Sequence, residues 1–278
     1  MVPKILYYIK FLIISQKAII NINKGKIERP QEMTHPASVD QEEIKNFARL
    51  ADQWWNPEGP MKPLHQMNPL RIKFIRDHLV AHFHQDVSDL TPLENLTLLD
   101  VGSGAGLLTE PLARLGAAVT GLDLAESSLT IARNRAEAQS LDITYLQSSV
   151  EELSQQNHQY HAVMALEVIE HVADVSSFLQ ACASLLQPKG LLFLSTLNRT
   201  PPSYLTAILG AEYILRLLPR GTHQWHKFLK PSEVDAELRK IGFLIKDLQG
   251  MRFRPLYKTW QLSKNLSVNY ILCAEKIA

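Results

Sequence analysis

The sequence has few cysteines, no excess of basic residues and no long uninterrupted apolar run. Its two cysteines, Cys182 and Cys273, are far apart and belong to no C-x-x-C pair, which excludes a disulfide framework and a zinc signature. The 29 lysines and arginines nearly balance the 28 aspartates and glutamates. This balance excludes the overall positive field that gathers nucleic acid, so nucleic acid is not an expected partner.

The N-terminal segment is apolar, but it is not a membrane span. Three lysines interrupt its first 22 residues, and no apolar run approaches the ~20 residues that a span needs. A signal peptide would need a longer apolar core, and a mitochondrial transit peptide would need arginines. We expect residues 1–32 to be an oily leader outside the fold, with Met33 as the functional start. A basic anchor lying in a membrane interface is the alternative.

A glycine-rich stretch at residues 98–106, which reads LLDVGSGAG, is the most informative part of the chain. The apolar run predicts a buried strand, and the glycines let a ligand approach the backbone. The spacing does not match the G-x-G-x-x-G pattern of dinucleotide sites, because Leu107 stands where the third glycine would be. Asp123 follows the next apolar run, 21 residues after Gly102, where a carboxylate can accept both hydroxyls of a ribose. The pattern therefore indicates a nucleoside ligand.

Strands and helices alternate after this point, which is typical of a doubly wound parallel sheet. We expect a helical cap at 33–90, with a second helix opening near Pro69, and an α/β core at 91–278 with an apolar insertion at 199–230. The paired Trp54 and Trp55 lie in a predicted loop of the cap, where they either pack under a helix or contact substrate. The strands are expected at 97–101, 118–123, 143–147, 161–166, 191–196, 243–250 and 268–274.

An acidic cluster follows the fourth expected strand. Glu167, Glu170 and His171 come directly after Leu166, and ligands of open α/β sheets bind at the carboxyl ends of the strands. If this segment is helical, the three side chains share one face and can share a metal ion or a substrate proton. Alternatively, Glu170 and His171 only open the next helix and pair with solvent or a lysine.

The glycine loop together with Asp123 resembles the class I S-adenosylmethionine-dependent methyltransferases. In that superfamily the glycine loop holds the amino-acid end of the cofactor and the acid after the second strand holds its ribose. The resemblance implies a Rossmann-like sheet of seven mostly parallel strands that ends in an antiparallel hairpin.

Several further segments resemble one family, the ubiquinone-biosynthesis O-methyltransferases, from about Asp40 to the C-terminus. These segments are Phe47 with Trp54-Trp55, KPLH at 62–65, NPLR at 68–71, EVIEH at 167–171, STLNR at 195–199, GAEYILR at 210–216 and GTH at 221–223. The chain departs from many members in its leader and in Ser103, where they carry cysteine. The resemblance implies methyl transfer from S-adenosylmethionine to catechol hydroxyls of polyprenylated ubiquinone precursors.

The resemblance also implies the site residues. The cofactor contacts would be Arg71, Gly102, Asp123 and Leu166, with the Arg71 guanidinium a fitting partner for the cofactor carboxylate. Glu167, Glu170 and His171 would hold Mg²⁺, with His171 the weakest ligand because magnesium prefers oxygen. Either the metal lowers the phenol's pKa, or His171 or His223 acts as general base.

The stretch 201–218 is apolar on most sides but too short to span a bilayer. With Arg199, Arg216 and Arg220 around it, it is either an interfacial segment that meets a polyprenyl tail or a buried lid helix. We expect a cytoplasmic enzyme held peripherally at the inner membrane, with other ubiquinone-biosynthesis proteins as partners. The alternatives are methylation of another small hydrophobic acceptor, or a non-catalytic, cofactor-binding regulatory protein.

Overall fold

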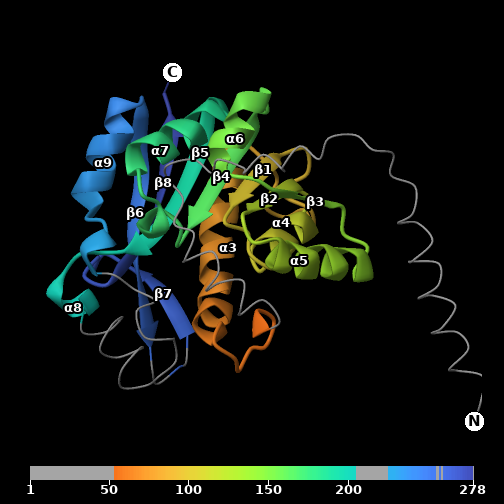
Figure 1. Ribbon diagram of the computed structural model, residues 1–278, viewed down its shortest axis with the longest axis horizontal. Helices are drawn as coiled ribbons and strands as arrows, with labels where there is room; N and C mark the ends of the chain where they lie inside the picture. Colours follow the sequence, from red (N-terminus) through yellow and green to blue (C-terminus); the bar gives the residue numbers. More distant parts are fainter. Residues whose placement is uncertain (1–52, 205–224, 255–256, 258, 278) are drawn as a thin grey trace, which may run out of the picture. The chain divides into compact units, whose positions relative to one another are not determined.

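A computed structural model describes residues 53–204, 225–254, 257 and 259–277. In this part of the chain eight strands form one sheet, in the order β3-β2-β1-β4-β5-β8-β6-β7 (Figure 1). The strands are β1 Thr97–Val101, β2 Ala118–Asp123, β3 Ile143–Gln147, β4 Tyr160–Leu166, β5 Leu186–Leu197, β6 Phe243–Arg254, β7 Thr259–Ser263 and β8 Asn269–Lys276.

The predicted α/β class and the mostly parallel sheet are confirmed. Strands β1 to β5 pair in parallel, whereas β8 lies between β5 and β6 and is antiparallel to both. The predicted number of seven strands is wrong by one. The additional strand, β7, pairs antiparallel with β6 at the edge of the sheet. This strand has only five residues, which are exposed or partly buried. It therefore lacks the continuous apolar run that marks the inner strands.

Helices cover both faces of the sheet (Figure 1). They are α3 Lys62–His82, α4 Thr109–Arg114, α5 Glu126–Ala138, α6 Val150–Leu153, α7 Val175–Ser184, α8 Pro201–Ser203 and α9 Pro231–Lys240. Helices α6, α7 and α9 share a core with one set of strand residues, such as Val163 and Leu192. Helices α3 and α4 share a second core with the alternate set, such as Ala162 and Phe193. This alternation follows from the two-residue period of a strand, which sends neighbouring side chains to opposite faces.

Helix α3 begins earlier than the sequence predicted. It starts at Lys62 rather than near Pro69, so Pro69 lies inside the helix and the KPLH segment forms its first turn. Pro63 is compatible with that turn, where a backbone N–H has no intrahelical partner. The interior Pro69 costs one helical hydrogen bond. Burial of Phe74, Ile75 and other apolar residues of α3 against the sheet offsets this cost.

The strand order reverses beside β1, whose neighbours are β2 and β4. Ligands of open α/β sheets bind at such a switch point, beyond the carboxyl ends of the strands. Both cysteines are buried and free. Within the described residues no helix is long and apolar enough to cross a membrane. The leader 1–32, Met33 and most of the segment 201–218 lie outside the described residues, and the division into leader, cap and core stays a prediction.

Candidate functional site

The glycine loop leaves β1 at the switch point. Backbone N–H groups of Gly102 and Ser103 donate to the carbonyl oxygen of Leu122 in β2, at 2.7 and 3.0 Å. Gly102 has φ +71° and Gly104 has φ +53°, a region that side-chain-bearing residues rarely adopt. A Cβ on Gly102 would lie 2.5 Å from a methyl carbon of Val168. The loop therefore needs glycine both for its backbone conformation and for space.

Asp123 ends β2 and fixes the same loop. One carboxylate oxygen accepts the N–H of Gly104 and the other accepts the N–H of Ala125, each at 2.8 Å. Burial raises the pKa of this carboxyl, although the backbone hydrogen bonds oppose the shift. A carboxylate oxygen has more than one lone-pair site, so each oxygen can accept a further hydroxyl. The carboxylate thus both shapes the loop and offers acceptors to a ribose.

Arg71 reaches this region from α3. Its side chain is 3% exposed, and its Nη2 lies 2.5 Å from Oε1 of Glu167. Its Nε is buried and has no hydrogen-bond partner among the described residues. Because a buried unpaired donor is costly, the guanidinium fits a site for an anionic group such as the cofactor carboxylate. Leu166, the fourth predicted cofactor contact, is partly buried at the end of β4.

Glu167 follows β4 in a left-handed conformation, with φ +57°. Its N–H donates to the carbonyl of Ser195 at 2.9 Å, and the Ser195 hydroxyl donates to its Oε1 at 2.7 Å. Backbone strain of this kind costs about 1–3 kcal/mol and persists only where surrounding contacts hold it. Here the ion pair with Arg71 and the contacts with Ser195 hold it, so Glu167 connects α3, β4 and β5.

The predicted metal group is not assembled in the described residues, where no three His, Cys, Asp or Glu side chains are arranged to hold a metal ion. The segment is not one helix, because Glu167 is left-handed and only Ile169–His171 form a 3₁₀ turn, η3. The oxygen of Glu167 already accepts from Arg71 and Ser195. Glu170 is 4% exposed and accepts from the Thr196 hydroxyl at 2.8 Å. As placed, this donor set does not fit Mg²⁺.

Two buried acids near the switch point have raised pKa values. Burial raises the pKa of Asp100 to about 7, and the negative charge of Asp123 adds to the shift. Burial and the charge of Glu167 likewise raise the pKa of Glu170 to about 7, although the charge of His171 acts to lower this pKa. Such shifts are concentrated at functional sites, although structural networks also produce them.

Ser195 and Thr196 had no predicted role. Both are fully buried at the end of β5, where they bind Glu167 and Glu170. The signal was a pair of hydroxyl residues near the carboxyl end of an otherwise apolar strand, at the edge where β4 also ends. His223, the second predicted base, lies outside the described residues. Arg199, one of the arginines around the 201–218 segment, pairs with Glu233 and donates to the carbonyl of His226.

Comparison with known proteins agrees with this fold. The family described as "Methyltransferase domain" matches residues 99–194. Magnesium protoporphyrin IX methyltransferase from Synechocystis PCC 6803, solved with bound S-adenosylmethionine, aligns with a TM-score of 0.56 at 21% identity, over 86% of this chain and 99% of that one. A plantazolicin methyltransferase solved with S-adenosylhomocysteine aligns with the same TM-score at 14% identity, over 85% and 98%. The chain therefore has the fold of the S-adenosylmethionine-dependent methyltransferases, with a methyltransferase domain at residues 99–194.

Curated relatives narrow this class. The ubiquinone biosynthesis O-methyltransferase of Azorhizobium caulinodans is 46% identical over 240 residues, which cover 86% of this chain and 95% of that protein. The enzyme of the same name from Paramagnetospirillum magneticum is 47% identical over 244 residues, covering 88% and 98%. The chain belongs to the ubiquinone biosynthesis O-methyltransferase family.

Proposed function

We propose that this enzyme transfers the methyl group of S-adenosylmethionine to phenolic hydroxyls of a polyprenylated catechol in ubiquinone biosynthesis. The observation that carries the proposal is the buried Arg71, whose Nε has no partner among the described residues, beside a glycine loop held by Asp123. This arrangement suits a ligand with a carboxylate at one end and a ribose at the other. The family relationship supplies the acceptor.

The chain's residues then have separable roles. Arg71 binds the carboxylate of the cofactor, and Glu167 keeps the guanidinium in place. Asp123 accepts the ribose hydroxyls, Gly102 lets the cofactor approach the backbone, and Leu166 packs against it. The bound cofactor supplies a methyl group already activated on a sulfonium, so the protein must mainly align the acceptor oxygen with it.

The phenol must also lose its proton, and we propose His171 as the base. It lies in η3, one residue after the buried Glu170, and it is partly exposed. A positioned base of this kind typically contributes ~10²- to 10⁴-fold. Mg²⁺ has no part in this mechanism, because the Glu167 oxygen that would bind it already accepts hydrogen bonds from Arg71 and Ser195.

The test is turnover of a short-tailed catechol with S-adenosylmethionine, followed by mass spectrometry of the methylated product. We expect O-methylation by the wild type and a loss of at least tenfold in kcat for His171→Ala with cofactor affinity unchanged. A wild type that binds cofactor but methylates carbon or another acceptor would contradict the substrate assignment. Parallel assays with EDTA, with and without added Mg²⁺, test a metal separately. Turnover that EDTA abolishes and Mg²⁺ restores would show that a metal ion takes part in the reaction and would contradict His171 as the sole means of lowering the phenol's pKa.

We further propose that the enzyme works on the surface of the inner membrane, where a polyprenyl tail partitions. Support comes from Tyr204 and Trp225, which border the part of the apolar segment outside the described residues. Their side chains are 43% and 38% exposed, and their rings meet edge to face at 6.2 Å. Exposed Tyr and Trp are common at membrane interfaces.

Liposome co-sedimentation of the full chain tests this placement. Replacing Tyr204 and Trp225 with serine should lower binding to anionic vesicles. Leu90→Ser is a matched control, because Leu90 is 91% exposed in the connection between α3 and β1. Equal sedimentation of all variants would count against an interfacial role for the two aromatic residues.

A further inference from the structure

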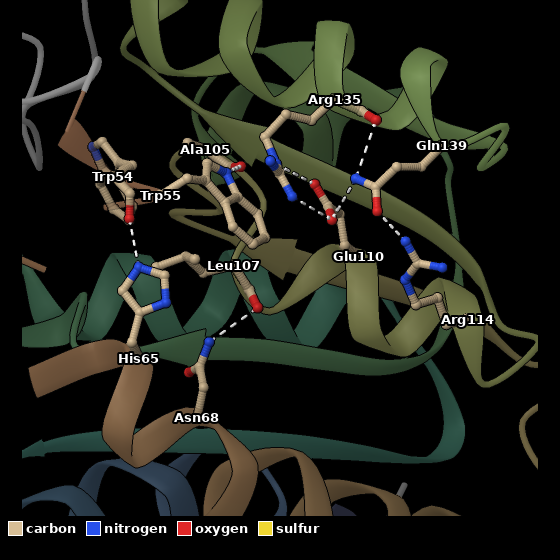
Figure 2. A network of polar contacts seen from close by, with 10 residues as sticks. All are labelled: Trp54, Trp55, His65, Asn68, Ala105, Leu107, Glu110, Arg114, Arg135 and Gln139. Carbon is tan, nitrogen blue, oxygen red and sulfur yellow. Dashed lines mark hydrogen bonds and ion pairs between the residues drawn. The ribbon is translucent and has the colours of Figure 1, made fainter. Parts of the chain in front are cut away.

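The two tryptophans before α3 contact the glycine loop directly (Figure 2). The indole N–H of Trp55 donates to the carbonyl oxygen of Ala105 at 2.8 Å. Within α3, the side-chain amide of Asn68 donates to the carbonyl oxygen of Leu107 at 2.9 Å, and Asn68 is 8% exposed. These two bonds hold the loop on either side of Gly106, a residue with φ +86°.

Trp54 packs against the loop at Gly104, one residue before Ala105. A Cβ on Gly104 would lie 2.4 Å from the ring of Trp54, so only glycine leaves room for this contact. The Trp54 side chain is 8% exposed, and its carbonyl oxygen accepts from Nε2 of His65 at 2.8 Å. This bond requires the proton on Nε2, and it ties the tryptophan pair to the first turn of α3.

Trp55 is held from the other side by helices α4 and α5. The guanidinium carbon of Arg135 lies 3.4 Å from the centroid of the Trp55 ring. Arg135 also pairs with the buried Glu110 at 2.8 Å, and Gln139 donates to the second oxygen of Glu110 at 2.9 Å. Figure 2 shows Arg135, Glu110 and Gln139 joined by polar contacts beside the Trp55 ring. A partly exposed cation over an indole contributes about 1 kcal/mol, which favours this position of the ring.

We propose that Trp54, Trp55, His65 and Asn68, here called the clamp, hold the glycine loop in the shape that binds S-adenosylmethionine. Trp55 and Asn68 are positioning residues that act through the Ala105 and Leu107 carbonyls. A loop with three glycines loses much conformational entropy when it is ordered. Contacts that order it before the cofactor arrives remove this cost from binding. The inference rests on the proposed location of the cofactor at this loop.

The experiment compares Trp55→Phe with Trp260→Phe in the full-length chain. Trp55→Phe removes the donor to Ala105 but keeps an aromatic ring under Arg135. Trp260→Phe makes the same chemical change in β7, where the indole nitrogen has no hydrogen-bond partner among the described residues. Calorimetry with S-adenosylhomocysteine measures the dissociation constant of each. We expect about a 3- to 10-fold weaker affinity for Trp55→Phe, the effect of one net hydrogen bond, and no change for Trp260→Phe.

Two further readouts separate positioning from general stability. At saturating S-adenosylmethionine, kcat of Trp55→Phe should stay within about twofold of wild type, while KM for the cofactor rises. Hydrogen exchange of the amides at 104–107 should become faster in the cofactor-free variant. Asn68→Leu, which removes the other donor, should reproduce both effects if Trp55→Phe folds poorly.

Two results would overturn the inference in different ways. If both variants are folded and bind S-adenosylhomocysteine as tightly as Trp260→Phe, the clamp does not position the loop, and the proposed function is untouched. A wild-type chain that binds neither S-adenosylmethionine nor S-adenosylhomocysteine would refute the proposed function and the clamp together.

Discussion

Asp123 offers the most direct test of the cofactor site. Its two carboxylate oxygens accept the N–H groups of Gly104 and Ala125, each at 2.8 Å. Replacement by alanine removes both bonds and the acceptors proposed for the ribose hydroxyls. A hydrogen bond to a charged group contributes about 1.5–3 kcal/mol. The change should therefore affect the loop itself as well as the ligand.

The expected loss of affinity follows from these contacts. One lost charged hydrogen bond to the ribose corresponds to about 10- to 150-fold in the dissociation constant. Loss of the Gly104 bond adds to this by loosening the loop. We expect calorimetry to show S-adenosylhomocysteine binding at least tenfold weaker for Asp123→Ala. Asp123→Asn, which keeps one acceptor oxygen, should fall between alanine and wild type.

Asp174 supplies a matched control for the structural part of the effect. Its side chain accepts the N–H of Ser177 at 3.1 Å and caps α7 at an exposed position. Asp174→Ala should lower the free energy of unfolding, because the N-cap of α7 is lost, with no change in cofactor affinity. If Asp123→Ala binds S-adenosylhomocysteine as tightly as Asp174→Ala does, the ribose assignment and the reasoning behind it are wrong.

Three further predictions concern the same region. Gly104→Ala should destabilise the fold by about 1–2 kcal/mol or more, because φ is +53° and the new Cβ meets the Trp54 ring; unchanged melting and cofactor affinity would contradict the loop geometry. Arg71→Lys should weaken S-adenosylhomocysteine binding about tenfold or more, since one ammonium cannot reproduce the planar fork that binds Glu167 and a carboxylate; equal calorimetric affinity would refute the assignment. Asp100 has its pKa raised to about 7, so its ionisation lowers stability as pH rises through that value. Relative to Asp100→Asn, wild type should lose about 3 kcal/mol of unfolding free energy between pH 5 and 8. Denaturant unfolding at both pH values measures this, and a difference between wild type and variant that does not change with pH would contradict it.

Most of the sheet could be predicted because its inner strands carry strong local signals. The runs at 97–101, 118–123 and 143–147 are apolar and bounded by turn residues, and the structure has strands with these bounds. The predicted elements differ from the structure where long-range packing determines the secondary structure. Helix α3 continues through Pro69 because its apolar face is buried on the sheet. Strand β7 exists because β6 extends to Arg254 and offers an edge to pair with.

The site could be predicted only in part, for a related reason. The glycine loop and Asp123 are local features whose spacing already indicates a nucleoside. The contact of Trp55 with Ala105 joins residues 50 positions apart, and the ion pair of Arg71 with Glu167 joins residues 96 positions apart. Patterns of local sequence spacing do not relate residues that are so far apart. The resemblance named Glu167 as a metal ligand, whereas its left-handed backbone and its contact with Arg71 are visible only in three dimensions.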